Sequence, residues 1–160
     1  KGRKGASIVN VSSIAAVGPG YSPTAYAVAK AGVLHLTKCA ATDLAQFGIR
    51  VNAIQPGFIN TNIFTASLEI TGEMKSMANA AIAQMSSNAQ PVARGGQPRD
   101  IANAVAFLAG EEASFMTGAS LIVDGGITLG PRHSWDPEEP GLFAALEAME
   151  EQAKQGAGTT

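Results

Sequence analysis

The chain has 160 residues, of which 46% are hydrophobic and 15% charged, and its formal net charge is -2. A chain of this length corresponds to one domain, and this composition is typical of a folded α/β domain and not of a disordered chain. The slightly acidic balance argues against nucleic acid as a partner. No apolar run approaches the roughly 18 residues that a membrane-spanning helix needs, so we expect a cytoplasmic protein without a membrane partner.

The chain contains one cysteine, Cys39. A single cysteine excludes an intramolecular disulfide. Because free cysteines behave as small apolar side chains, we expect Cys39 to be buried.

The first elements are predicted to be a strand, a loop and a long helix. Residues 7–12 are rich in valine and isoleucine and predict a short buried strand, and the loop 14–22 carries glycine and proline. Ser22-Pro23 supplies an N-cap and a first-turn proline for an alanine-rich helix over 24–47. Gly48 is expected to end that helix.

A second strand is predicted over residues 49–54, and it ends at Gln55-Pro56-Gly57. The order strand, helix, strand predicts a right-handed parallel βαβ unit. Ligands bind at the carboxyl ends of such strands. Ser13 and Pro56-Gly57 both fall at that edge, so two independent features of the sequence indicate the same location for a site.

The second half contains one more helix and one more strand. Residues 62–93 carry several methionines and alanines and predict mobile helices. Residues 94–102 lead into a helix that ends at Gly110, and we expect this segment to pack against the sheet. Residues 118–126 predict the third strand, ending in Asp-Gly-Gly.

Residues 131–160 form a C-terminal extension with several prolines, followed by an amphipathic helix from Leu142 to about Gln155. Our hypothesis is that this tail packs on a neighbouring subunit, with Trp135 as its anchor.

Three side chains could together perform chemistry on a carbonyl group: Ser13, Tyr26 and Lys30. Tyr26 and Lys30 are four residues apart, so a helix projects them from the same face. A phenol is a general acid, a nearby ammonium stabilises its phenolate, and the Ser13 hydroxyl can donate to a substrate oxygen. Taken alone, a Tyr-x-x-x-Lys spacing is a weak signal and is far more typical of an ordinary amphipathic helix with a solvated lysine.

Several motifs in the right order resemble the classical short-chain dehydrogenase/reductase family over residues 5–130. They are Ile8-Val-Asn-Val-Ser-Ser13, Tyr26 with Lys30, Arg50-Val-Asn-Ala-Ile-Gln-Pro-Gly57 and Asp124-Gly-Gly126. The resemblance implies an α/β fold with a Rossmann-type doubly wound parallel sheet. This chain would supply its C-terminal part, about three strands with flanking helices, as one domain over 1–130. Residues 62–93 would be the lid over the substrate.

The resemblance also implies an activity, namely reversible hydride transfer between NAD or NADP and a carbonyl or secondary alcohol. Tyr26 would give or take the hydroxyl proton, Ser13 would hold the substrate oxygen, and Lys30 would also hydrogen-bond the nicotinamide ribose. Tyrosine and serine provide the polarisation, so no metal is expected. The resemblance implies a homodimer or homotetramer.

Pro56-Gly-Phe-Ile-Asn-Thr61 resembles the family's Pro-Gly-x-x-x-Thr loop, which holds the nicotinamide. It implies cofactor contacts from Pro56 and Gly57, from the backbone of Ile59 and from the hydroxyl of Thr61. The residue that selects NAD or NADP has no counterpart in this sequence, so that choice stays open. The sequence does not define the substrate.

Two other interpretations stay open: an epimerase or dehydratase of the extended family, and a non-catalytic fragment that serves as an oligomer subunit. The chain begins at Lys1 and lacks the family's pyrophosphate-binding glycine loop and its Asn-Asn-Ala-Gly segment. We therefore expect it to be a piece of a longer protein and to be inactive alone.

Overall fold

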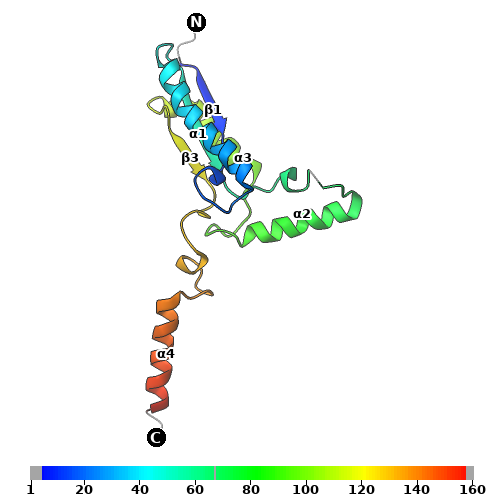
Figure 1. Cartoon of the computed structure of the whole chain (residues 1–160), viewed down its shortest axis with the longest axis vertical. Helices are drawn as coiled ribbons and strands as arrows, with labels where there is room; N and C mark the ends of the chain where they lie inside the picture. The colour runs from blue at the N-terminus through cyan, green and yellow to red at the C-terminus, as the bar shows by residue number, and fades with distance from the viewer. Residues whose placement is uncertain (1–4, 67, 158–160) are drawn as a thin grey trace. The chain divides into compact units, whose positions relative to one another are not determined.

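Three parallel strands organise the first part of the molecule (Figure 1). The computed structural model describes residues 5–66 and 68–157. Strand β1 (Ser7–Val11) pairs with β2 (Arg50–Pro56), and β2 pairs with β3 (Ser120–Val123), which gives the order β1-β2-β3. The predicted α/β class with a parallel sheet and flanking helices is confirmed.

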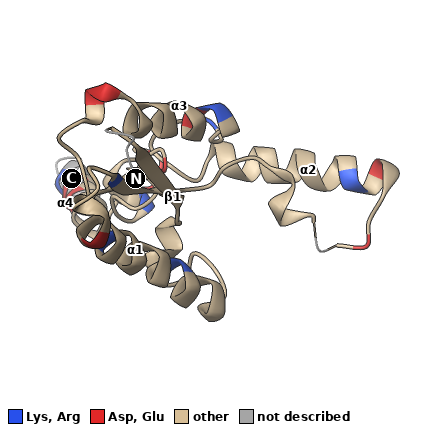
Figure 2. Cartoon of the chain, turned by 90° about the horizontal axis from the view of Figure 1, so that it is seen from above, with Lys and Arg blue, Asp and Glu red and all other residues tan. Residues whose placement is uncertain are grey.

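Helices α1 (Thr24–Ala45) and α3 (Pro98–Ala109) cover opposite faces of this sheet, as Figure 2 shows. Side chains alternate between the two faces of a strand, so neighbouring residues of β2 serve different helices. Ile54 packs with Leu108 of α3, and both are fully buried. Burying each of these side chains stabilises the fold by roughly 1.5–3 kcal/mol. On the other face, Asn10 of β1 donates to the Thr37 hydroxyl of α1 at 3.0 Å.

Two details of α1 differ from the predictions. Ser22 was expected to cap the helix, but Pro23 occupies the N-cap position, and the Ser22 hydroxyl donates to the Pro23 carbonyl oxygen at 3.3 Å. Cys39 was expected to be buried and is exposed. Thr37 and Ala41 face the sheet, and a residue midway between them points away from it.

Between β2 and α3 the chain forms helix α2 (Gly72–Ser87), whose methionines Met74, Met77 and Met85 are exposed. Short 3-10 turns precede and follow the main elements, at Ile14–Ala16, Asn62–Phe64 and Glu111–Ala113. The N-caps of the first two turns are the predicted site residues Ser13 and Thr61.

The chain divides into two compact units, residues 1–128 and 129–160. The second unit contains a 3-10 turn, Arg132–Ser134, and helix α4 (Leu142–Ala157). Arg132 Nε pairs with Asp136 Oδ2 at 2.7 Å, and its guanidinium lies 5.9 Å from the centre of the Trp135 ring. The role of this tail in a neighbouring subunit stays a prediction. None of the described helices has the length and hydropathy required to cross a membrane.

Candidate functional site

The carboxyl end of β1 is joined to the first turns of α1 by Ser12. Its N–H donates to the Ile54 carbonyl oxygen at 2.8 Å, which extends the pairing with β2 by one residue. Its hydroxyl is buried and donates to the Lys30 carbonyl oxygen at 2.8 Å. Ser12 therefore fixes the strand end, where Ser13 follows, against the helix that carries Tyr26 and Lys30.

The side chain of Lys30 lies close to the Tyr26 ring and to the C-terminal end of β1. Lys30 Nζ lies 5.4 Å from the centre of the Tyr26 ring and donates to the Val11 carbonyl oxygen at 3.0 Å. Tyr26 is 38% exposed, and its hydroxyl has no hydrogen-bond partner within residues 5–66 and 68–157. The phenol is thus open to an external molecule while the ammonium is held beside it.

Ser13 has a structural role that leaves its proton available. The residue is extended (φ -167°, ψ 158°) and caps the turn Ile14–Ala16, where its Oγ accepts from the Ala15 N–H at 3.2 Å. Accepting a hydrogen bond uses a lone pair of the hydroxyl and not its O–H. Ser13 can therefore cap its turn and donate to a substrate oxygen at the same time.

The predicted cofactor loop begins where β2 passes very close to the end of β3. The Gly57 N–H donates to the Val123 carbonyl oxygen at 3.0 Å. A Cβ added to Gly57 would lie 2.6 Å from both Cα and Cβ of Asp124. Only glycine fits here, so the loop leaves the sheet at a position fixed by β3.

The backbone N–H and C=O of Ile59 face away from the segment with which it pairs. It forms an isolated parallel bridge with Gly96, in which the Asn60 N–H donates to Gly96 O at 2.8 Å and the Gly96 N–H donates to Phe58 O at 3.2 Å. In this arrangement the N–H and C=O of Ile59 point to the opposite side, and in the described part of the chain neither is hydrogen-bonded. A carboxamide, which needs one donor and one acceptor, matches this pair of groups.

Thr61 repeats the arrangement of Ser13. Its Oγ1 caps the turn Asn62–Phe64 by accepting from the Ile63 N–H at 3.3 Å. Its O–H is again free to donate, and the residue is exposed. Pro56, the remaining predicted cofactor residue, is the last residue of β2 and pairs with Val123.

Asp124 closes the turn that follows β3. Its carboxylate accepts from the Gly126 N–H at 2.8 Å and from the Thr128 N–H and hydroxyl at 3.1 and 2.6 Å. The side chain therefore organises the Asp-Gly-Gly turn. Within the ranges that the structure describes, no group of three or more histidine, cysteine or acidic residues is placed to hold a metal ion.

The segment before α3 contacts the predicted cofactor loop, a contact that the sequence did not indicate. Arg94 and Asp100 form a two-pronged ion pair, with N–O distances of 2.7 and 2.9 Å. This hydrogen bonding with Arg94, together with a bond from the Gln97 N–H, lowers the pKa of Asp100 to about 2. Besides packing on the sheet, as expected, the segment holds Gly96 beside Ile59.

A cavity of about 270 Å³ adjoins the predicted cofactor loop. Phe58, Ile59, Gln90 and Asp124 are among its lining residues. None of Ser13, Tyr26 and Lys30 lines it, so it is separate from the place where the phenol and the ammonium meet.

The known proteins to which this chain is similar in sequence include dehydrogenases and reductases. A family model described as enoyl-(acyl carrier protein) reductase matches residues 2–128. The cis-4-hydroxycyclohexanecarboxylate dehydrogenase of Sinomonas cyclohexanicum is 45% identical over 122 residues, which is 76% of this chain and 44% of the relative. The 3-oxoacyl-[acyl-carrier-protein] reductase FabG of Staphylococcus aureus is 45% identical over 127 residues, or 78% of this chain and 46% of the relative. The chain thus spans less than half the length of these relatives.

Solved structures similar to this chain also include dehydrogenases. The aldohexose dehydrogenase of Thermoplasma acidophilum has a TM-score of 0.68 at 38% identity, covering 81% of this chain and 50% of that one. A short-chain dehydrogenase/reductase of Caenorhabditis elegans, solved with cofactor, has a TM-score of 0.66 at 37% identity, covering 80% and 47%. A 4-hydroxyisoleucine dehydrogenase complexed with NADH has a TM-score of 0.62 at 30% identity, covering 78% and 47%.

Proposed function

Because the chain belongs to the classical short-chain dehydrogenase/reductase family, we propose that it supplies the catalytic side chains and the nicotinamide loop of an NAD- or NADP-dependent oxidoreductase. The substrate is a carbonyl compound or the corresponding secondary alcohol. One observation carries the proposal: Lys30 Nζ is held 5.4 Å from the Tyr26 ring by a bond to the strand end that Ser13 follows.

Tyr26, Lys30 and Ser13 have different roles at the substrate oxygen. In reduction, the Tyr26 hydroxyl gives its proton to the carbonyl oxygen, and in oxidation the phenolate takes the proton back. The Lys30 ammonium stabilises the phenolate, and the Ser13 O–H donates to the oxygen as negative charge develops on it.

The cofactor loop fits a nicotinamide. The free N–H and C=O of Ile59 match the carboxamide, and the free O–H of Thr61 is an additional donor beside them. When bound, the nicotinamide supplies or accepts the hydride. The NADH-complexed 4-hydroxyisoleucine dehydrogenase among the structural neighbours supports this cofactor class.

The named relatives favour redox chemistry over the alternatives that the sequence left open. They are dehydrogenases and reductases, acting by name on a hydroxycyclohexane ring, an aldohexose or a 3-oxoacyl group. A non-catalytic subunit would have no need for a phenol and an ammonium that meet at the strand ends. We therefore propose a catalytic protein, of which this chain alone is an inactive part.

The test is the variant Tyr26→Phe in the full-length gene product. Loss of the proton donor should lower kcat by at least about 10²–10⁴-fold, while nicotinamide binding, measured by fluorescence titration, stays within about twofold. The thermal unfolding midpoint should not fall, because no described residue bonds the hydroxyl. A Tyr26→Phe enzyme within tenfold of the wild-type kcat would refute the assignment.

Lys30→Met provides a second test with a matched control. It should lower both turnover and cofactor affinity, because the ammonium is placed beside the phenol and the proposed ribose site. Lys38→Met removes a lysine from an exposed position further along α1 and should change neither. Equal behaviour of the two variants would remove Lys30 from the mechanism.

A further inference from the structure

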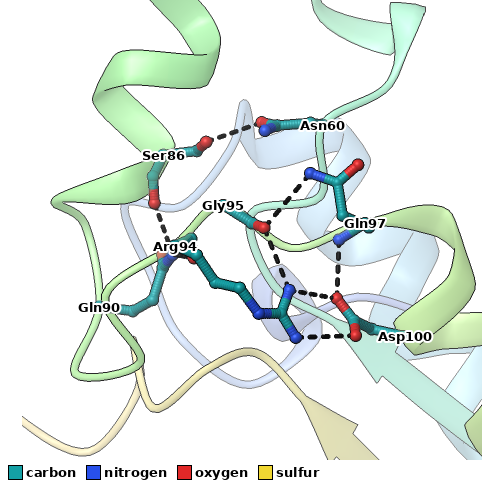
Figure 3. A network of polar contacts seen from close by, with 7 residues as sticks. All are labelled: Asn60, Ser86, Gln90, Arg94, Gly95, Gln97 and Asp100. Carbon is teal, nitrogen blue, oxygen red and sulfur yellow. Dashed lines mark hydrogen bonds and ion pairs between the residues drawn. The ribbon is translucent and has the colours of Figure 1, made fainter.

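A polar network joins the nicotinamide loop to the end of α2 and the start of α3, as Figure 3 shows. The proposed function does not use this network. Its members are Asn60, Ser86, Gln90, Arg94, Gly95, Gln97 and Asp100.

A side-chain hydrogen bond joins the loop to the C-terminal end of α2. The Ser86 hydroxyl lies 2.7 Å from Asn60 Oδ1, and Ser86 is fully buried. A Cβ on Gly95 would overlap both the Ser86 hydroxyl and the Asn60 amide, so glycine is needed for the two to meet. The sequence separation of 26 residues makes this a tertiary contact that links two segments across the site.

Gln90 fixes the end of α2 to the segment that carries Gly95. Its Nε2 donates to the carbonyl oxygens of Ser86 and Arg94. Gln90 is 3% exposed, and in the described part of the chain its Oε1 has no partner. These two donor bonds link the last turn of α2 to the backbone of Arg94, directly before Gly95.

The far end of the network is anchored on α3. Arg94 forms its two-pronged pair with Asp100 there, and the Gln97 N–H donates to the same carboxylate at 2.8 Å. Ser86 is therefore linked through Gln90 and Arg94 to Asp100 of α3, and through its hydroxyl to Asn60.

Asn60 links this network to the proposed nicotinamide loop. It directly follows Ile59, and its own N–H bonds to Gly96. A displacement of Asn60 changes the direction of the Ile59 N–H and C=O. We propose that Ser86 is a positioning residue that, through Asn60, orients the backbone N–H and C=O of Ile59 toward the nicotinamide. The C-terminal end of α2, within the predicted lid 62–93, is thereby coupled to nicotinamide binding. This inference rests on the proposed function.

The neighbouring serine provides a matched control. The Ser86 and Ser87 hydroxyls both lie 2.9 Å from the Ala83 carbonyl oxygen, but only Ser86 reaches Asn60. Ser86→Ala and Ser87→Ala therefore remove the same group from the same helix end and differ in the contact with the loop.

The experiment compares two ligands on the full-length gene product. NADH carries the nicotinamide, and ADP-ribose lacks it; NADPH and 2′-phospho-ADP-ribose replace them where the wild type prefers the phosphorylated form. Ser86→Ala should weaken NADH about tenfold and change ADP-ribose by less than twofold, whereas Ser87→Ala should change neither. Ser86→Ala that weakens both ligands equally, or neither, overturns the positioning role.

A second variant covers the case in which Ser86→Ala does not fold. Asn60→Ala removes the other partner and should give the same difference between NADH and ADP-ribose. Where both fold, the double variant should lose no more NADH affinity than either single one, and additive losses overturn the proposal. A wild-type protein that binds ADP-ribose but not NADH or NADPH would instead refute the proposed function.

Discussion

Gly57→Ala tests whether the close approach of β2 and β3 fixes the loop 56–61, which we propose binds the nicotinamide. The new Cβ would lie 2.6 Å from the Cα and Cβ of Asp124 and 3.1 Å from its carbonyl oxygen. Carbon atoms in contact are normally about 3.5–4.0 Å apart, so the two segments must separate by about 1 Å. The 3.0 Å bond between the Gly57 N–H and the Val123 carbonyl oxygen would then stretch beyond hydrogen-bonding range.

The expected cost follows from these two changes. Overpacking of this kind costs about 1–3 kcal/mol and the lost bond about 0.5–1.5 kcal/mol, so the free energy of unfolding should fall by about 1.5–4.5 kcal/mol. A displacement of the loop by about 1 Å should also lower kcat/KM by about 10²-fold. Urea unfolding of the full-length gene product, followed by circular dichroism, measures the first quantity, and steady-state kinetics measure the second.

Gly32→Ala is the matched control, because it makes the same chemical change inside α1. No heavy atom lies within 4 Å of the added Cβ, and the residue is helical, so alanine should stabilise the protein by about 0.5–1 kcal/mol. A Gly57→Ala protein as stable as the wild type, with unchanged kcat/KM, would refute the argument that only glycine fits between the strand ends.

Two further predictions concern acid stability and the tail. The folded pKa of Asp100 is about 2 against an ordinary 3.8, so its pair with Arg94 contributes stability above pH ~4 that is lost as the pH falls through about 2. Asp100→Asn should therefore flatten the dependence of the urea midpoint on pH between ~5 and ~2. Equal slopes in the wild type and Asp100→Asn would contradict this. Deleting residues 133–160 should lower the number of subunits in the assembly, measured by light scattering, or change kcat/KM. An unchanged subunit number with unchanged kinetics would remove the hypothesis that the tail packs on a neighbour.

The features that the sequence predicted are those set by local periodicity. Tyr26 and Lys30 could be placed together because helical geometry relates residues four apart. Ser13 and Gly57 could be placed at one edge because parallel strands end on the same side of a sheet. The first placement follows from helix geometry and the second from the expected βαβ topology, and neither requires knowledge of side-chain packing.

The features that were missed depend on packing between distant segments. The exposure of Cys39 could not be inferred, because an alanine-rich helix has no clear apolar stripe to show which face meets the sheet. The contact of Ser86 with Asn60 and the two donor bonds of Gln90 depend on where α2 ends relative to the cofactor loop. No residue type or spacing marks such contacts in advance.

The capping role of Ser13 has an evolutionary consequence. Serine, threonine, aspartate and asparagine all cap such turns, but an ionised aspartate has no proton to donate. A lineage that abandoned catalysis could thus keep the turn Ile14–Ala16 intact with aspartate at this position. Such a substitution beside an unaltered Tyr26 and Lys30 would mark a pseudoenzyme that still looks complete by its tyrosine and lysine alone.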